Sequence, residues 1–168
     1  MKRLRMLLPL IALVAACSRG PDRIQHGRWD FEVVMTELDA TGLSAEQQQQ
    51  ARAGLNQPQT NRECVTPDEA ANPLSEIREQ FTRNQGASCQ TTDDVFSGGI
   101  IRFRASCRGS NGSSARVQLA LEGRFEAITL IANVSVTAEG PNPNGSGTVT
   151  LRTRGTVRGR RVGDCARN

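Results

Sequence analysis

Cysteine is the residue type with the clearest chemistry in this chain, which contains five of them. Cys89 and Cys107 lie nine residues either side of Gly98, and Gly98-Gly99 is a turn signal between two strand-like arms. Folding the arms back about Gly98 places the two cysteines opposite each other. Directly opposed Cβ atoms are about 4.5–5.5 Å apart, which is close enough for a disulfide. The sequence therefore predicts a covalently closed hairpin in the middle of the chain.

Cys17 has a different chemistry because of the residues that precede it. Residues 1–16 carry cations, then a short apolar run, then small residues. This pattern is typical of a secretory signal, and its apolar core is too short to span a bilayer. The segment V-A-A-C that ends at Cys17 resembles a bacterial lipobox, which implies cleavage before Cys17 and acyl chains on it. An ordinary signal peptide with an incidental cysteine is the alternative.

Four cysteines remain after lipidation, an even number that indicates disulfides in an exported protein. The hairpin pairs Cys89 with Cys107, which leaves Cys64 for Cys165. A zinc site with four thiolates is the alternative, but no C-x-x-C pair is present and the compartment is oxidising. We therefore expect two disulfides, no metal and no cofactor.

Other side chains that could carry catalysis are few. The only histidine, His26, falls beside the expected tether and is expected to be solvated. Asp93 and Asp94 are consecutive in a strand arm, so their side chains point to opposite faces and do not form a carboxylate dyad. Trp29 could serve as a ligand platform, but a tryptophan at a strand start is more typical of a core. We expect no catalytic residue, and therefore a protein that is not an enzyme.

The charge of the chain depends on the signal. The full sequence is +4, but removal of residues 1–16 leaves 18 of its 21 cations against 17 anions, so nucleic-acid binding is not expected. Residues 17–101 hold 7 arginines and 13 acids, whereas residues 102–168 hold 11 arginines and 4 acids. This asymmetry predicts ion pairs across a sheet. For Arg152 and Arg154, the nearest candidate partners are Asp30 and Glu32; an open arginine patch would instead indicate an anionic partner.

The elements that position these residues are mostly strands. Period-two alternation and turn signals predict strands over 27–38, 61–65, 88–96, 100–107, 115–122, 125–137 and 147–157. Capping boxes predict a helix over 45–55 and a second one from Thr66, which Asn72-Pro73 interrupts. Within the strand at 125–137, we expect Ile128, Leu130, Val134 and Val136 to share one face.

These elements indicate an α+β, mainly β fold. We expect a curled antiparallel meander sheet, partly open and barrel-like, with two short helical segments on one side and disulfide staples. The expected organisation is a signal peptide at 1–16, the lipidated Cys17 and a tether at 17–26, and a single domain at 27–168.

The domain also resembles a known family. Its motifs are Gly27-Arg28-Trp29, Q-P-Q at 57–59, C-V-T-P-D-E at 64–69, Cys89, Cys107, and G-R-R-V-G-D-C at 159–165. In this order they resemble the uncharacterised bacterial domain-of-unknown-function family numbered thirty-six-seventeen. The resemblance implies exported, often lipid-anchored proteins with no established activity.

Three classes of function follow from these features. The first is a cell-envelope lipoprotein that acts as a non-enzymatic binding or structural module, with the membrane or an envelope protein as its partner. Ser18 after the anchor, in place of Asp, resembles the sorting signal for the outer rather than the inner membrane. The second is a carrier or chaperone for a lipophilic ligand inside the curled sheet, because only 4% aromatic residues leave a wide interior hard to fill. An enzyme is the third.

Overall fold

The computed structural model describes residues 20–75, 77–79, 88–109, 114–142 and 146–166. The segment expected to be a signal peptide, residues 1–16, lies outside these residues, as do Cys17 and Ser18. The described elements are β1 (Gly27–Thr41), α1 (Ala45–Ala53), β2 (Gln59–Val65), α2 (Pro67–Ala71), β3 (Ser88–Ser97), β4 (Ile100–Arg108), β5 (Arg116–Phe125), β6 (Thr129–Pro141) and β7 (Thr148–Gly163).

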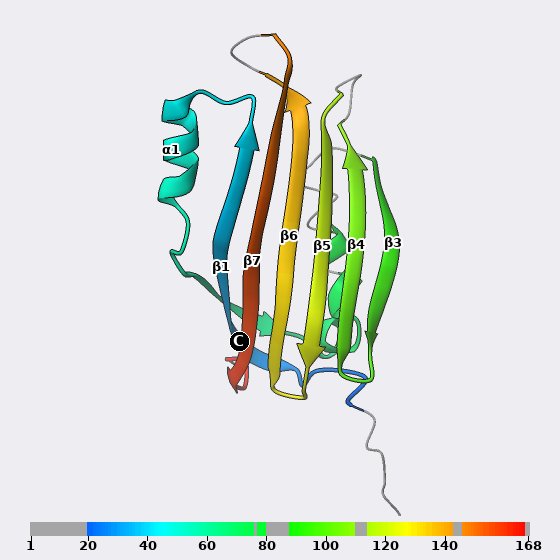
Figure 1. Cartoon of the computed structure of the whole chain (residues 1–168). Coiled ribbons are helices and arrows are strands. Elements are labelled where there is room, and N and C mark those ends of the chain that lie inside the picture. The colour runs from blue at the N-terminus through cyan, green and yellow to red at the C-terminus, as the bar shows by residue number, and fades with distance from the viewer. Residues whose placement is uncertain (1–19, 76, 80–87, 110–113, 143–145, 167–168) are drawn as a thin grey trace, which may run out of the picture.

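The strands form one open sheet in which every neighbouring pair is antiparallel. Its order is β2-β1-β7-β6-β5-β4-β3, so β3 to β7 are a meander and β1 pairs with the last strand. The expected mainly β meander is therefore confirmed as a seven-stranded sheet that does not close. Figure 1 shows the β3–β4 turn, the β5–β6 turn and the chain's C-terminus at one end of the sheet, which we call the lower end.

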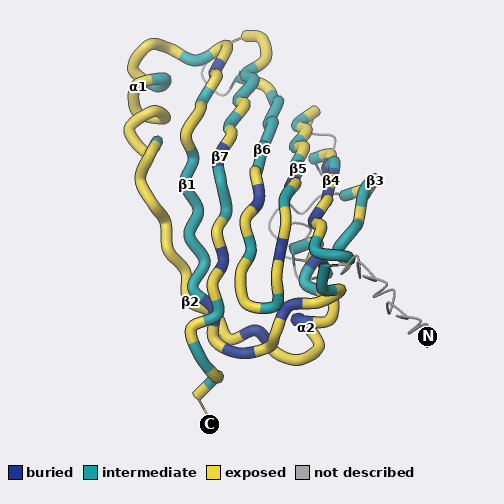
Figure 2. Tube along the Cα trace, turned by 60° about the horizontal axis from the view of Figure 1, so that its bottom comes forward, coloured by how far each residue is buried: buried dark blue, intermediate teal, exposed yellow. Residues whose placement is uncertain are grey.

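The two faces of the sheet differ in chemistry. Alternating residues of β4 define them: Ile101 and Phe103 are fully buried on the inner face, whereas Arg102 and Arg104 are exposed on the outer face. The core on the inner face consists of Ile24, Trp29, Val65, Ala70, Leu74, Ile101, Phe103, Ala105, Leu121, Phe125 and Ala132. Burial falls toward the upper end, where intermediate and exposed positions dominate (Figure 2).

The two helices have different roles. Both begin with the expected capping boxes, at Ser44 for α1 and at Thr66 for α2. α2 contributes Ala70 to the inner-face core. After the break at Asn72, a helical turn at 73–75 contributes Leu74 to the same core. α1 buries no residue and lies beside the upper half of β1, beyond the edge that β2 covers (Figure 1).

β1 runs to Thr41, past the expected 27–38, and contains a bulge. The register with β7 shifts between Met35 and Glu37, so that Leu38 rejoins the inner face. Gly155 lies opposite Met35, and a Cβ atom there would come within 2.3 Å of the Val34 carbonyl oxygen. The close approach of the two backbones at the bulge therefore depends on the missing side chain of Gly155.

The turn between β5 and β6 differs from the sequence expectation. The prediction that the second strand begins at residue 125 and carries Ile128 on one face with Leu130 is wrong, because β5 continues through Gly123 to Phe125 and β6 begins at Thr129. Gly123 stays in the strand because its bare Cα lets Ala132 pack closely, where an added Cβ would meet the Ala132 Cβ at 2.6 Å. Ile128 instead lies in the turn and is exposed.

Residues 20–26, expected as part of a tether, form a strap across the lower end. Gly99 donates its backbone N–H to the Pro21 carbonyl at 2.7 Å, and Gln25 donates to Ala127 at 2.7 Å. The Arg161 Nε donates to the carbonyl of His26 at 2.8 Å. The strap therefore joins the β3–β4 turn, the β5–β6 turn and β7.

Disulfides join the two cysteine pairs that the sequence analysis expects. Cys89 and Cys107 are opposed in the β3–β4 hairpin with Cα atoms 4.0 Å apart. Cys64 in β2 bonds to Cys165, which follows β7, across a Cα separation of 5.5 Å. Because β1 lies between β2 and β7, the second bond fastens the edge strand to the chain end over the start of β1.

Candidate functional site

A ladder of ion pairs joins β1 and β7 on the outer face. Its three pairs are Arg152–Asp39 at 3.7 Å, Arg154–Glu37 at 3.3 Å and Arg158–Glu32 at 3.4 Å. The expected pairing across the sheet is present, but the expected partners of Arg152 and Arg154 are wrong. Because β1 and β7 run antiparallel, the first residues of β1 meet the last residues of β7, so Asp30 and Glu32 lie opposite Arg160 and Arg158. Exposed pairs of this kind contribute about 0–1 kcal/mol each.

Asp30 makes its ion pair with the other neighbour of β1. Arg62 in β2 donates two hydrogen bonds to this carboxylate, at 2.5 Å from Nε and 2.9 Å from Nη2. These bonds lower the pKa of Asp30 below its ordinary value, with a smaller electrostatic contribution from Arg62 and Arg28. The same pair raises the pKa of Arg62. Asp30 is therefore held ionised by a fork that fixes β2 against β1.

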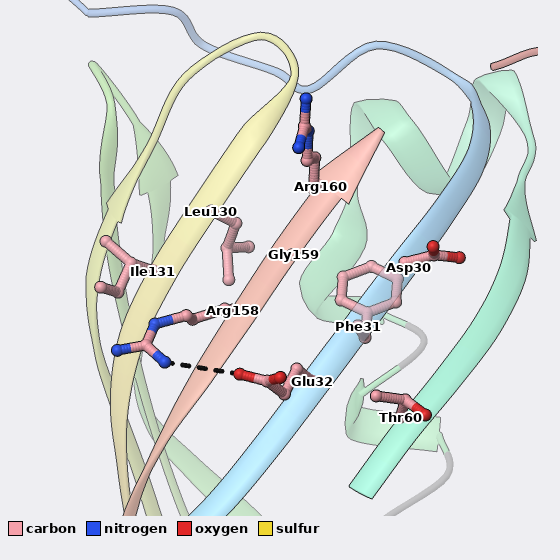
Figure 3. Close-up of a pocket in the computed structure, with 9 residues that line it drawn as sticks. All are labelled: Asp30, Phe31, Glu32, Thr60, Leu130, Ile131, Arg158, Gly159 and Arg160. Atoms are coloured by element: carbon pink, nitrogen blue, oxygen red, sulfur yellow. Dashed lines mark hydrogen bonds and ion pairs between the residues drawn. The ribbon is translucent and has the colours of Figure 1, made fainter. Parts of the chain in front are cut away.

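A shallow pocket of about 460 Å³ lies near the lower end, where β2, β1, β7 and β6 adjoin. It is lined by Asp30, Phe31, Glu32, Thr60, Leu130, Ile131, Arg158, Gly159 and Arg160. Figure 3 shows Arg158 and Glu32 facing each other, with Ile131 beside them, while Arg160 points away from the pair. The pocket combines the Arg158–Glu32 pair, the Asp30 carboxylate that Arg62 holds and the Thr60 hydroxyl with the apolar side chains of Phe31, Leu130 and Ile131.

A second hollow of about 420 Å³ lies higher on the outer face. Small side chains from neighbouring strands, Ala120, Ser135 and Thr156, form its floor between Arg104 and Arg154. Each of these arginines already has a carboxylate partner, Asp93 at 3.8 Å and Glu37 at 3.3 Å. The hollow therefore offers little uncompensated charge to an anionic ligand.

The residues considered for chemistry in the sequence do not gather at one place. His26 is exposed on the strap, and Trp29 is fully buried, with its Nε1 donating to the Gln25 carbonyl at 2.9 Å. Asp93 pairs with Arg104, whereas Asp94 pairs with Arg78 from the helical segment. Across the described ranges, no group of three metal-ligating side chains is found.

Sequence reasoning missed a set of apolar residues at the lower end. Ile100, Ile128, Ile131 and Val162 are the large hydrophobic residues that are exposed in the described part of the chain. Ile100 and Ile131 fall on the outward phase of their strands, opposite Arg124 in β5. The period-two alternation predicts polar residues at these outward positions. Isoleucines found there are the signal in the sequence that could have revealed this set.

Comparison with known proteins identifies the family. A family model described as "Protein of unknown function (DUF3617)" matches residues 24–165. The chain belongs to this family. Searches of curated proteins and of solved structures found no match.

The DUF3617 match has boundaries that the structure explains. It begins at Ile24, which the strap buries in the core, and ends at Cys165, which bonds to Cys64. The DUF3617 unit therefore includes the inner part of the strap and the disulfide at the chain end. Among the residues that the structure describes, no helix has the length and apolarity to cross a membrane.

Proposed function

We propose that this DUF3617 protein is a cell-envelope lipoprotein, anchored through acyl chains on Cys17, whose domain is a non-enzymatic binding module. The signal-like residues 1–16 and the V-A-A-C segment before the domain support export and lipidation. Two cysteine pairs at disulfide distance support an oxidising compartment. Ser18 favours the outer membrane over the inner one.

The strap is the observation that carries this proposal. Gly20 packs against the β3–β4 turn so closely that an added Cβ would lie 2.6 Å from the Gly98 carbonyl oxygen. Asp22 accepts a hydrogen bond from the Gly98 N–H at 2.9 Å. Three peptide units separate Cys17 from Gly20, and they reach at most about 11 Å. An acylated Cys17 would thus hold one defined end of the sheet close to a bilayer.

The test is the state of Cys17 in the protein isolated from cells. Intact-mass analysis of the membrane fraction should find a chain that starts at Cys17 and carries acyl groups, because several acyl chains hold a protein stably on a bilayer. Cys17→Ser should abolish the acyl mass and release the protein or leave residues 1–16 attached. Cys64→Ser is the matched control, since it replaces a cysteine of the folded domain in the same way and should leave lipidation intact. A wild-type protein recovered free of lipid in the soluble fraction would refute the anchor.

A second candidate, a carrier of a lipophilic ligand, is favoured by the upper half of the inner face. Beyond the buried core, β1, β5, β6 and β7 place a further set of apolar side chains on this face, all half-buried. They are Val33, Met35, Leu38, Val117, Val136, Ala138, Val149 and Leu151. An apolar surface that continues past the core is suited to a ligand of the same chemistry.

Native mass spectrometry of the protein purified from membranes would test the carrier function. The wild type should retain a stoichiometric amount of bound lipid, and the double variant Val117→Thr, Val136→Thr should lose it. Threonine has nearly the same shape as valine, but its hydroxyl group disfavours contact with an apolar ligand. Val34→Thr is the matched control, because Val34 is half-buried on the outer face. Equal lipid occupancy in all three proteins, or none in the wild type, would exclude this role.

A further inference from the structure

Among the residues that the structure describes, the exposed large hydrophobic side chains cluster at the end of the sheet where Gly20 packs. Ile100 is 45% exposed, Ile128 47%, Ile131 51% and Val162 39%. Ile100 follows the β3–β4 turn, Ile128 lies in the β5–β6 turn, and Val162 is near the end of β7. All of these segments lie at the lower end (Figure 1). Exposed aliphatic side chains gathered at one end of a largely polar outer face therefore mark a contact surface.

Arginines alternate with these isoleucines in register. Ile100 is paired with Arg124, Arg124 with Ile131, and Ile131 with Arg158, so one row crosses four neighbouring strands. At about 4.8 Å between strands, the row is roughly 14 Å long. Arg160 extends it downward on β7, on the same face as Arg158, and the exposed Val162 follows at the bulge where the register with β1 shifts between Arg28 and Trp29.

Two of these arginines are available for a ligand. Arg158 is paired with Glu32, but among the described residues neither Arg124 nor Arg160 has an ion pair or a side-chain hydrogen bond. The acids nearest to Arg124 in sequence are Glu122, on the same face of β5, and Glu126, in the β5–β6 turn; neither forms an ion pair with it. Guanidinium groups bind phosphate oxygens through paired N–H donors. An isoleucine between two such arginines suits the boundary of a bilayer, because the arginines can bind head-group phosphates while the isoleucine contacts the acyl chains.

We propose that this lower corner of the outer face, formed by Ile100, Arg124, Ile128, Ile131, Arg160 and Val162, docks on the phospholipid surface. The inference rests on the proposed lipid anchor, because the strap fixes Gly20 at the β3–β4 turn beside Ile100. Docking orients the sheet: its lower outer corner contacts the head groups, and the upper end of the inner face points away from the bilayer. The domain is then a membrane-oriented module, rather than one that swings freely on its anchor.

Tryptophan reporters in the full-length, processed protein test the orientation. Ile128→Trp places a reporter in the docking corner, and Thr148→Trp places a matched one at the exposed start of β7, at the upper end. Trp29 is the only native tryptophan and is fully buried, so the wild type supplies the background. The proteins are reconstituted in vesicles of phosphatidylethanolamine and phosphatidylglycerol whose acyl chains carry bromine. The Ile128→Trp emission should be quenched and blue-shifted, and the Thr148→Trp emission should be unchanged.

A charge variant tests the role of the arginines. Arg124→Gln with Arg160→Gln should weaken vesicle partitioning of the unacylated Cys17→Ser chain about 25-fold, because each arginine lost near an anionic surface should weaken it about 5-fold. In the anchored protein it should reduce the quenching of Ile128→Trp. Arg108→Gln with Arg116→Gln is the control, because these two arginines are opposed at the upper end and remove the same charge. Thermal unfolding of each variant checks that the fold is kept.

The outcomes separate this inference from the lipid anchor. If the acylated protein floats with the vesicles but both reporters are equally quenched, or neither is, docking is refuted and the anchor stands. If Cys17 carries no lipid and the corner still binds vesicles, docking stands and the anchor fails. Protection of Ile128→Trp in native envelopes, without any quenching in pure lipid vesicles, would assign the corner to a protein partner and overturn the membrane assignment.

Discussion

Cys64 and Cys165 are bonded across β1, joining the edge strand β2 to the segment that follows β7. The bond closes a sequence separation of 101 residues, whereas Cys89–Cys107 closes one of 18. In the chain-entropy model, closed loops of about 100 and about 15 residues contribute about 4.7 and 3 kcal/mol. The longer bond also holds the chain end, where no further strand follows Gly163 among the described residues.

Removal of each disulfide should therefore have a different effect. The Cys64→Ala, Cys165→Ala double variant should lower the melting temperature more than the Cys89→Ala, Cys107→Ala double variant, in a calorimetric comparison at one pH. Peptide mapping of the unreduced wild type supplies the control on connectivity. A peptide linking Cys64 to Cys89 or Cys107 would contradict the pairing, and a larger loss from the hairpin variant would contradict the entropy argument.

Trp29 should be the most sensitive single position of the core. It is fully buried, stacks on Phe31 with ring centroids 5.9 Å apart, and donates a hydrogen bond to the strap at Gln25. Trp29→Ala should lower the free energy of unfolding by about 3–5 kcal/mol, as for other large aromatic truncations. Val162→Ala, at an exposed position, should change it by no more than about 0.5 kcal/mol. Urea unfolding of both variants measures the difference, and comparable losses would show that the strap end is not packed as described.

Gly155 should not tolerate even a methyl group. An added Cβ would lie 2.3 Å from the Val34 carbonyl oxygen, in the strand backbone at the bulge. Gly155→Ala should lower the free energy of unfolding by about 1–3 kcal/mol, because the two strands must separate locally. Gly54→Ala is the control: its Cβ would meet nothing within 4 Å, and its φ of −85° suits any residue. Equal stability of the two variants by urea unfolding would argue against the close approach.

Asp30 should titrate below the ordinary aspartate range in the folded protein. The hydrogen bonds from Arg62 lower its pKa, so the unfolded chain binds the proton more tightly than the folded one. The resulting stabilisation is present above the unfolded pKa and is lost as the pH falls through the folded pKa. Carboxyl titration by NMR should show the pKa of Asp30 rising toward its ordinary value in Arg62→Gln and staying low in Arg154→Gln, which removes a different pair. An unchanged pKa in Arg62→Gln would remove Arg62 as the cause.

The sequence alone determined the parts of this protein that depend on neighbours in the chain. Gly98-Gly99 with its alternating arms fixes the β3–β4 hairpin and sets Cys89 opposite Cys107. The capping boxes at Ser44 and Thr66 start their helices where the local hydrogen bonds require. Period-two alternation likewise marks the strands and the inward position of Trp29. These features follow from local geometry, because each is decided within a few residues.

Only the tertiary structure decided which distant segments meet. The register of β1 on β7 places Arg154 opposite Glu37 rather than Asp30, and the pairing with β7 continues beyond the bulge to Thr41, past the expected end of β1. The strap becomes part of the domain because hydrogen-bond acceptors from residues 20–26 meet donors on two distant segments, Gly99 and Arg161. The lower corner exists because Ile100, Arg124 and Ile131 come into register across three strands. Such contacts depend on strand order, which no local pattern specifies, and strand order sets which side chains share one surface.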